Sequence, residues 1–199
     1  MKVTIKTGNL KTLIKKLEQD EKDAQKVLKA TGNDLRRRAP GKVADEVTTV
    51  YNIKKSEITP SGKGAKPKKK AGSVSVRGTT VTDVTLVYKG RMLTPTHFAM
   101  RPTKPQKRPK GKRRPKPITA EIKKGKRKSL GSNVFLGTNR GGGYIPFKRK
   151  TAKRYPIEAV KTVSMPQMVD NPAVRSEIRK DINELLRTRL NHNLKRFMK

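Results

Sequence analysis

Apolar side chains in the first part of the chain recur at helical spacing. After a short alternating start at Val3 and Ile5, positions spaced i, i+3, i+4 and i+7 form one face, which comprises Leu10, Leu13, Ile14, Leu17, Ala24, Val27 and Leu28. A second helical stretch carries Val43, Val47 and Val50. Pro40 lies between the two. Because its ring clashes with the preceding turn, we predict that it kinks or breaks any long helix here.

The middle of the chain reads as strands. Residues 73–77 and 80–88 are alternating or β-branched and are separated by Gly78, which predicts a hairpin. Further strands are expected at residues 118–122, 133–136 and 144–147, with a turn at 139–143, and a short one at residues 97–100.

The C-terminal segment predicts one long helix. Asn171-Pro172 is typical of an N-cap followed by proline at the first helical position. The apolar face then runs through Val174, Ile178, Ile182, Leu185, Leu186, Leu190, Leu194 and Phe197. We expect the N- and C-terminal helical faces to pack on the small sheet, because a few short strands alone would leave one face unburied.

Charge changes this picture. The 199 residues carry a formal net charge of +36, and only 32% of them are hydrophobic, which suffices for one modest core. Such a surface repels itself and is best accommodated against a large anion. The chain has no run of 18 apolar residues, so the sequence predicts no membrane span. The absence of cysteine excludes disulfides, thiol catalysis and cysteine-based zinc sites.

The positive charge is concentrated in the middle. Residues 84–157 hold 22 Lys/Arg and a single acid, Glu121, while residues 101–117 hold nine Lys/Arg and five Pro. Lysine and arginine bind phosphates independently of sequence, through counterion release. The candidate phosphate contacts are Arg101, Lys104, Lys107, Arg108, Lys110, Lys112, Arg113, Arg114, Lys116, Lys123, Lys124, Lys126, Arg127 and Lys128. The alternative is that these runs are solvated, or assist assembly with an acidic protein.

Residues that carry catalysis are scarce. His97 and His192 are the only imidazoles, and neither has a second histidine or an acid at metal-ligand spacing. The Gly-rich basic runs at residues 111–113, 125–129 and 141–143 lack the phosphate-loop pattern. We therefore expect no enzyme activity, no cofactor and no metal site.

Several blocks, in order along the chain, resemble the minor tail protein Z family of long-tailed phages and prophages. The most specific is Lys153-Arg154-Tyr155-Pro156-Ile157-Glu158 followed by Ser164-Met165-Pro166-Gln167-Met168-Val169. The other blocks are residues 43–47 with 51–58, residues 71–78, and residues 119–125 continuing to Phe135. Pro40 and the long basic segment at 101–117 depart from the family pattern.

The resemblance implies an α+β fold, with a small antiparallel sheet flanked by long N- and C-terminal helices and basic Pro/Gly-rich loops. It implies one tail-completion domain over residues 1–199. Its parts are N-terminal helices (1–58), a basic loop (59–71), strands (72–100), the basic Pro-rich segment (101–117), strands with the PIE–PQM connection (118–169) and the C-terminal helix (170–199).

The resemblance also implies a structural virion protein, made in the host cytoplasm, that completes the tail at its head-proximal end, the neck. Expected partners are the tail terminator, tail tube and head–tail connector, with further copies of the chain in a ring. Contact with double-stranded genome DNA is our addition, drawn from the charge.

We assign a protein interface to the PIE–PQM region, at Tyr155, Pro156, Ile157, Met165, Pro166 and Met168. Two prolines favour an extended, turn-rich connection here, and methionines adapt to irregular apolar contacts. The alternative is that both methionines fill the core.

Two other functions compete with tail completion. The high charge and basic Pro/Gly-rich extensions are also typical of ribosomal and other RNA-binding proteins, whose arms fold on RNA. A DNA-processing enzyme is disfavoured, because converging carboxylates are missing from the basic middle.

Overall fold

The computed structural model describes residues 22–60, 71–78, 81–106, 117–139 and 141–198, together with the backbone of residues 2–4. The predicted helical face at Leu10, Leu13, Ile14 and Leu17 lies outside these residues, as do most of the basic loop at 59–71 and residues 107–116 of the Pro-rich segment.

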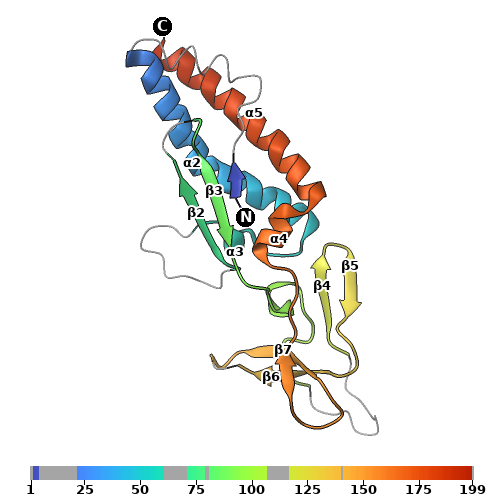
Figure 1. The fold of residues 1–199 in the computed structure, drawn as a ribbon. Helices are drawn as coiled ribbons and strands as arrows, with labels where there is room; N and C mark the ends of the chain where they lie inside the picture. The colour runs from blue at the N-terminus through green and yellow to red at the C-terminus, as the bar shows by residue number, and fades with distance from the viewer. Residues whose placement is uncertain are drawn as a thin grey trace.

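Two long helices form the body of the molecule (Figure 1). Helix α2 (Lys22–Val50) and helix α5 (Pro172–Phe197) lie side by side and antiparallel, since Thr31 contacts Asn193 and Lys42 pairs with Asp181. As predicted, α5 begins at a capped proline: the side chain of Asn171 accepts a hydrogen bond from the Ala173 amide. The buried face of α5 comprises Val174, Ile178, Ile182, Leu186 and Leu190.

A polar contact lies within this apolar interface. The side-chain amide of Asn193 donates to the Thr31 hydroxyl at 3.0 Å, and that hydroxyl donates to the Val27 carbonyl at 2.8 Å. Both side chains are buried, and a buried polar group is costly unless it is hydrogen-bonded. The pair therefore favours this one alignment of α2 against α5.

Pro40 does not break the helix as the sequence predicts it could, because α2 continues through it from Lys22 to Val50. Proline has no N–H, so the Arg36 carbonyl loses its usual helical donor. The helix persists because one buried stripe spans the proline, with Leu35 and Ala39 before it and Val43 and Ala44 after it. Tertiary packing overrides the local penalty.

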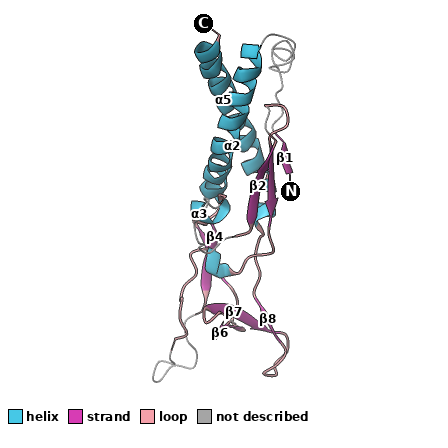
Figure 2. Cartoon of the chain, turned by 90° about the vertical axis from the view of Figure 1, so that its left-hand side faces the viewer, coloured by secondary structure: helices cyan, strands magenta, loops and turns pink. Residues whose placement is uncertain are grey.

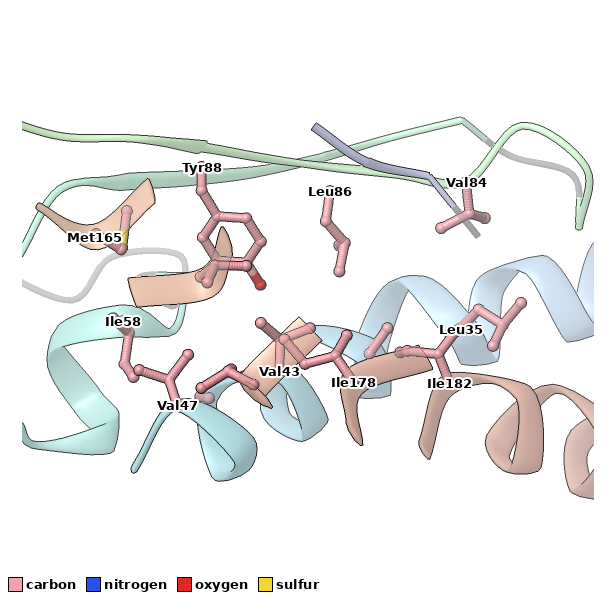
Figure 3. Close-up of a cluster of buried hydrophobic side chains, with 14 of the residues drawn as sticks. Leu35, Val43, Val47, Ile58, Val84, Leu86, Tyr88, Met165, Ile178 and Ile182 are labelled. Atoms are coloured by element: carbon pink, nitrogen blue, oxygen red, sulfur yellow. The ribbon is translucent and has the colours of Figure 1, made fainter. Parts of the chain in front are cut away.

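A three-stranded antiparallel sheet packs on the helices. Strand β3 (Thr85–Lys89) lies between β1 (Lys2–Thr4) and β2 (Ser73–Arg77), so the pairing of the predicted hairpin is confirmed. Its second strand is shorter than predicted, because residues 81–83 form a turn. In Figure 3, Leu86 and Tyr88 point from β3 toward Val43 on α2 and Ile178 on α5. Burial raises the pKa of the Tyr88 hydroxyl.

Two short helices lie next to the long ones, at the end of α2 and at the start of α5. Helix α3 (Lys55–Ile58) follows α2, and helix α4 (Met165–Asp170) precedes α5. The Asn171 side chain also donates to the Tyr51 hydroxyl at 2.9 Å, which links the start of α5 to the end of α2.

The remaining strands form a distal lobe, away from the chain's C-terminus (Figures 1 and 2). It contains a hairpin of β4 (Thr119–Lys123) and β5 (Lys126–Ser129), and a sheet in the order β6 (Val134–Thr138), β7 (Tyr144–Arg149), β8 (Ile157–Ala159). A small core of Met100, Ile118 and Ala120 joins them. The fold class is thus α+β, with several small antiparallel sheets.

The lobe contains one wrong strand prediction and two strands that the pattern missed. Residues 97–100 are not a strand: a 3₁₀ turn, η2 (Pro95–His97), begins at a proline that cannot donate to a ladder. Strand β5 has no apolar position, and β8 has only three residues.

Leu186→Ala should lower the free energy of unfolding by about 2–5 kcal/mol, because it empties a fully buried site. Leu185→Ala should cost clearly less, since Leu185 is half-buried at the margin of the core. Urea unfolding of the two variants tests this. Equal losses would mean that the core face of α5 is misplaced.

Candidate nucleic-acid and docking surfaces

The β4–β5 hairpin gathers five of the candidate phosphate-binding residues in the described part of the chain. Gly125 closes its turn with a φ of +71°, a conformation that glycine adopts without strain. Around that glycine lie five exposed cations: Lys123, Lys124, Lys126, Arg127 and Lys128. Lys123 and Lys126 are cross-strand partners, and like charges directly opposite each other destabilise a hairpin. A polyanion in contact would relieve that repulsion.

Arg127 differs from its neighbours because it is held by the protein. Its guanidinium donates to the Ala99 carbonyl at 2.8 Å and pairs with Glu121 at 3.2 Å. Glu121 also accepts from the Gly125 amide at 3.0 Å. The acid that stands alone in the basic middle therefore organises the turn, and Arg127 supports the hairpin. The four lysines remain for a ligand.

Backbone hydrogen bonds fix the hairpin to the helical body. The Asn52 amide donates to the Ile122 carbonyl at 2.9 Å, and the Lys124 amide donates to the Val50 carbonyl at 3.0 Å. Ile122 also packs against the main core. The lysines are thus displayed on a supported element at the end of α2.

Of the basic Pro-rich segment, the structure describes Arg101 and Lys104, both exposed, whereas Lys107, Arg108, Lys110, Lys112, Arg113, Arg114 and Lys116 lie outside the described residues. Arg101 and Thr119 exchange two backbone hydrogen bonds of 2.8 Å. Pro105, Gln106 and Pro117, which belong to the segment and border residues 107–116, line one hollow of about 480 Å³ with Val134 and Leu136. Both described parts of the segment therefore lie beside β6.

The PIE–PQM region forms two ordered elements rather than one extended connection. Ile157 and Glu158 lie in β8, which pairs with β7, and Met165–Asp170 is α4. Ser164 caps α4: the Gln167 amide donates to its hydroxyl, and its own amide donates to the Gln167 side chain at 2.8 Å.

The interface assignment of Met165 and Met168 is wrong. Both side chains are fully buried and belong to the main core, so the alternative that they fill it is correct. Pro166 is half-buried. Tyr155, by contrast, is 63% exposed, Pro156 is exposed and Ile157 is half-buried. These last residues remain candidates for an interface.

A histidine–carboxylate pair connects the helical body with the distal lobe. Nδ1 of His97, on η2, donates to Oε2 of Glu57, on α3, at 2.5 Å, and both side chains are largely buried. They line a cavity of about 510 Å³ together with Tyr144 of β7. The two residues are 40 positions apart, so no sequence spacing indicates the pair.

Among the described residues, no group of three or more His, Cys, Asp or Glu side chains is arranged to hold a metal ion. None of the helices in the described ranges has both the length and the apolar character needed to cross a bilayer.

Comparisons with known proteins give no assignment. No family model, no curated protein and no solved structure matches this chain.

Proposed function

We propose that this protein is a non-catalytic virion component that completes a phage tail at the neck. The observation that carries the proposal is the ordered series of blocks resembling minor tail protein Z, of which the PIE–PQM block is the most specific. The blocks coincide with elements that support the core or the lobe. Those elements are the end of α2, α3, β2, the β4–β5 hairpin, β8 and α4.

The distribution of charge supports a role beside DNA. The helical body buries the apolar residues, whereas the lysines of the β4–β5 hairpin are exposed at one place on a supported turn. Exposed lysines of this kind bind the phosphates of nucleic acid and do not distinguish one base from another. In a neck, the hairpin would face the path of the genome, and the helical body would contact neighbouring protein rings.

Deletion of the gene from the phage or prophage that encodes this chain tests the proposal. We expect filled heads and separate, tube-complete tails in electron micrographs, with infectivity restored by the wild-type gene supplied in trans. Mass spectrometry of purified wild-type particles should detect the protein.

Joined, infectious particles after deletion would contradict the proposal. If the protein instead cosediments with ribosomal subunits in a salt-sensitive manner, the RNA-binding alternative is correct.

A further inference from the structure

The sheet β6–β7–β8 has one face that neither core uses. Cross-strand partners point to the same side of a sheet, and the register pairs Phe135 with Phe147, Gly137 with Ile145, and Phe147 with Ala159. Arg149 and Ile157, also paired, lie on this same side. We call it the outer face; its apolar residues are Phe135, Ile145, Phe147, Ile157 and Ala159.

The opposite side of the sheet is the one that packs on the protein. Val134 and Leu136, which alternate with Phe135 along β6, contact the small core of the lobe, and Pro146 on β7 is buried. The apolar residues of the outer face are all half-buried rather than buried, and none belongs to either core. In a chain with only four Phe, two are placed there.

Contacts among the side chains of the outer face fix their positions. The rings of Phe135 and Phe147 lie 6.1 Å apart, inclined by 28°. Phe147 lies over Gly137, where an added Cβ would be 2.9 Å from the ring. The Arg149 guanidinium lies 4.7 Å from the centre of Phe135 and donates to the Arg154 carbonyl at 2.7 Å. These contacts hold the patch in one shape before any partner binds.

Cations border the outer face. Arg149 lies on it, and Lys150, Lys153 and Arg154 follow in the connection between β7 and β8. The nearby acid, Glu158, is already paired with Lys150 at 3.1 Å. An apolar centre with a charged rim is the usual anatomy of a protein interface. Charge complementarity requires a partner whose rim is acidic.

A second copy of the chain does not supply that rim. Of the nine acids on its described helices, Glu57 is buried beside His97 and five are held in ion pairs within the chain, namely Asp23–Lys26, Asp45–Lys55, Asp181–Lys42, Asp170–Arg175 and Glu177–Lys180. The other three, Asp34, Glu46 and Glu184, are too few to surround the outer face. Nucleic acid also fits less well. It offers phosphates to the cations but nothing to Ile145 and Ile157, and Arg149 covers the ring of Phe135 on which a base would stack.

We propose that the outer face docks a different protein, one that presents apolar side chains surrounded by aspartate or glutamate. The inference goes beyond the proposed function, because it names a surface and the chemistry of its partner. It can be tested with the purified full-length chain, without any particle, so its failure is distinguishable from failure of the tail assignment.

The test uses three short synthetic peptides of equal length. The first has Leu and Phe anchors flanked by Glu, the second has Ser in place of the anchors, and the third has Gln in place of Glu. We expect fluorescence anisotropy at physiological ionic strength to show binding of the first peptide. The other two peptides should bind about tenfold more weakly than the first, or more weakly still.

Two variants locate the binding. Ile145→Thr combined with Ile157→Thr keeps β-branched residues in both strands, so the sheet should persist. It should reduce binding of the first peptide to the level of the second. The control variant Arg179→Glu with Arg187→Glu, at two exposed positions of α5 in the helical body, should bind the first peptide about as tightly as the wild type. Unchanged melting temperatures and amide spectra would establish that both variants are folded.

Three outcomes would overturn the inference. The first is equal binding of the first and second peptides, which would mean charge attraction alone. The second is that a single-stranded oligonucleotide binds and that its binding requires Ile145 and Ile157, which would identify nucleic acid as the ligand. The third is self-association in sedimentation that the isoleucine variant abolishes, which would identify a second copy.

Discussion

Replacing the four lysines of the β4–β5 hairpin with glutamine should flatten the salt dependence of duplex DNA binding. The residues are Lys123, Lys124, Lys126 and Lys128, all exposed. Each phosphate contact contributes about 0.9 to the slope of log K against log[salt], so the loss should reach about 3–4 units if all four bind. The affinity should fall equally for unrelated sequences, because backbone contacts carry no base information. Titrations of a labelled duplex at several salt concentrations measure both quantities.

The control removes the same charge elsewhere. Arg179, Arg187, Lys195 and Arg196 are exposed on α5, and glutamine at all four should change the slope much less. If both variants flatten the slope equally, DNA contacts the whole cationic surface and the hairpin is no specific site. A third variant, with glutamine at Lys110, Lys112, Arg113 and Arg114, tests the Pro-rich segment separately, and there too we expect a loss of up to about 3–4 units.

The sequence predicts well those elements whose signal is local. Strand β2 matches its prediction at both ends, and α5 begins at the proline that follows Asn171. In both cases the signal that predicts the element lies in the element itself or beside it: the alternation of residues in β2, and the capping residue and apolar repeat of α5. A capping side chain and a repeating apolar face act within one turn of the helix, so they are visible without knowledge of the fold.

Predictions failed where a distant segment decides the outcome. Pro40 remains helical because α5 covers the stripe on both sides of it. Strand β5, with the sequence Lys-Arg-Lys-Ser, has no alternation to detect and depends on Gly125 and on Glu121 bound to Arg127. The sequence predicts an interface at Met165 and Met168, which are buried instead, because composition does not show which way α4 faces.

In the candidate site, too, the sequence predicts the local features and misses those that depend on distant segments. Composition indicates the basic residues, but it does not show that Arg127 is held by Glu121 while its lysine neighbours are exposed. The outer face of β6–β7–β8 depends on the register, because only the pairing of Phe135 with Phe147 and of Arg149 with Ile157 places these residues together. The β8 strand that completes it is too short to recognise from sequence.

His97→Ala should destabilise the fold by about 3–5 kcal/mol, because it leaves the Glu57 carboxylate buried without its partner. Within the described residues, His97 is the side chain that hydrogen-bonds Glu57, and Glu57 is 5% exposed. The loss should be read from the midpoint and slope of urea unfolding. We expect the distal lobe to loosen first, because the pair connects α3 with η2 at the junction between the body and the lobe.

A double variant separates the cost of an unpaired carboxylate from the loss of packing. Removing both polar groups, as Glu57→Met with His97→Leu, should recover most of the stability, since replacing a buried pair by apolar residues of similar volume is often neutral or better. Glu57→Gln alone should be milder than His97→Ala, because an amide remains a hydrogen-bond partner and carries no charge to bury. If the double variant is as unstable as His97→Ala, the imidazole acts by filling space. If His97→Ala costs less than about 1 kcal/mol, water reaches Glu57 and the junction is open to solvent.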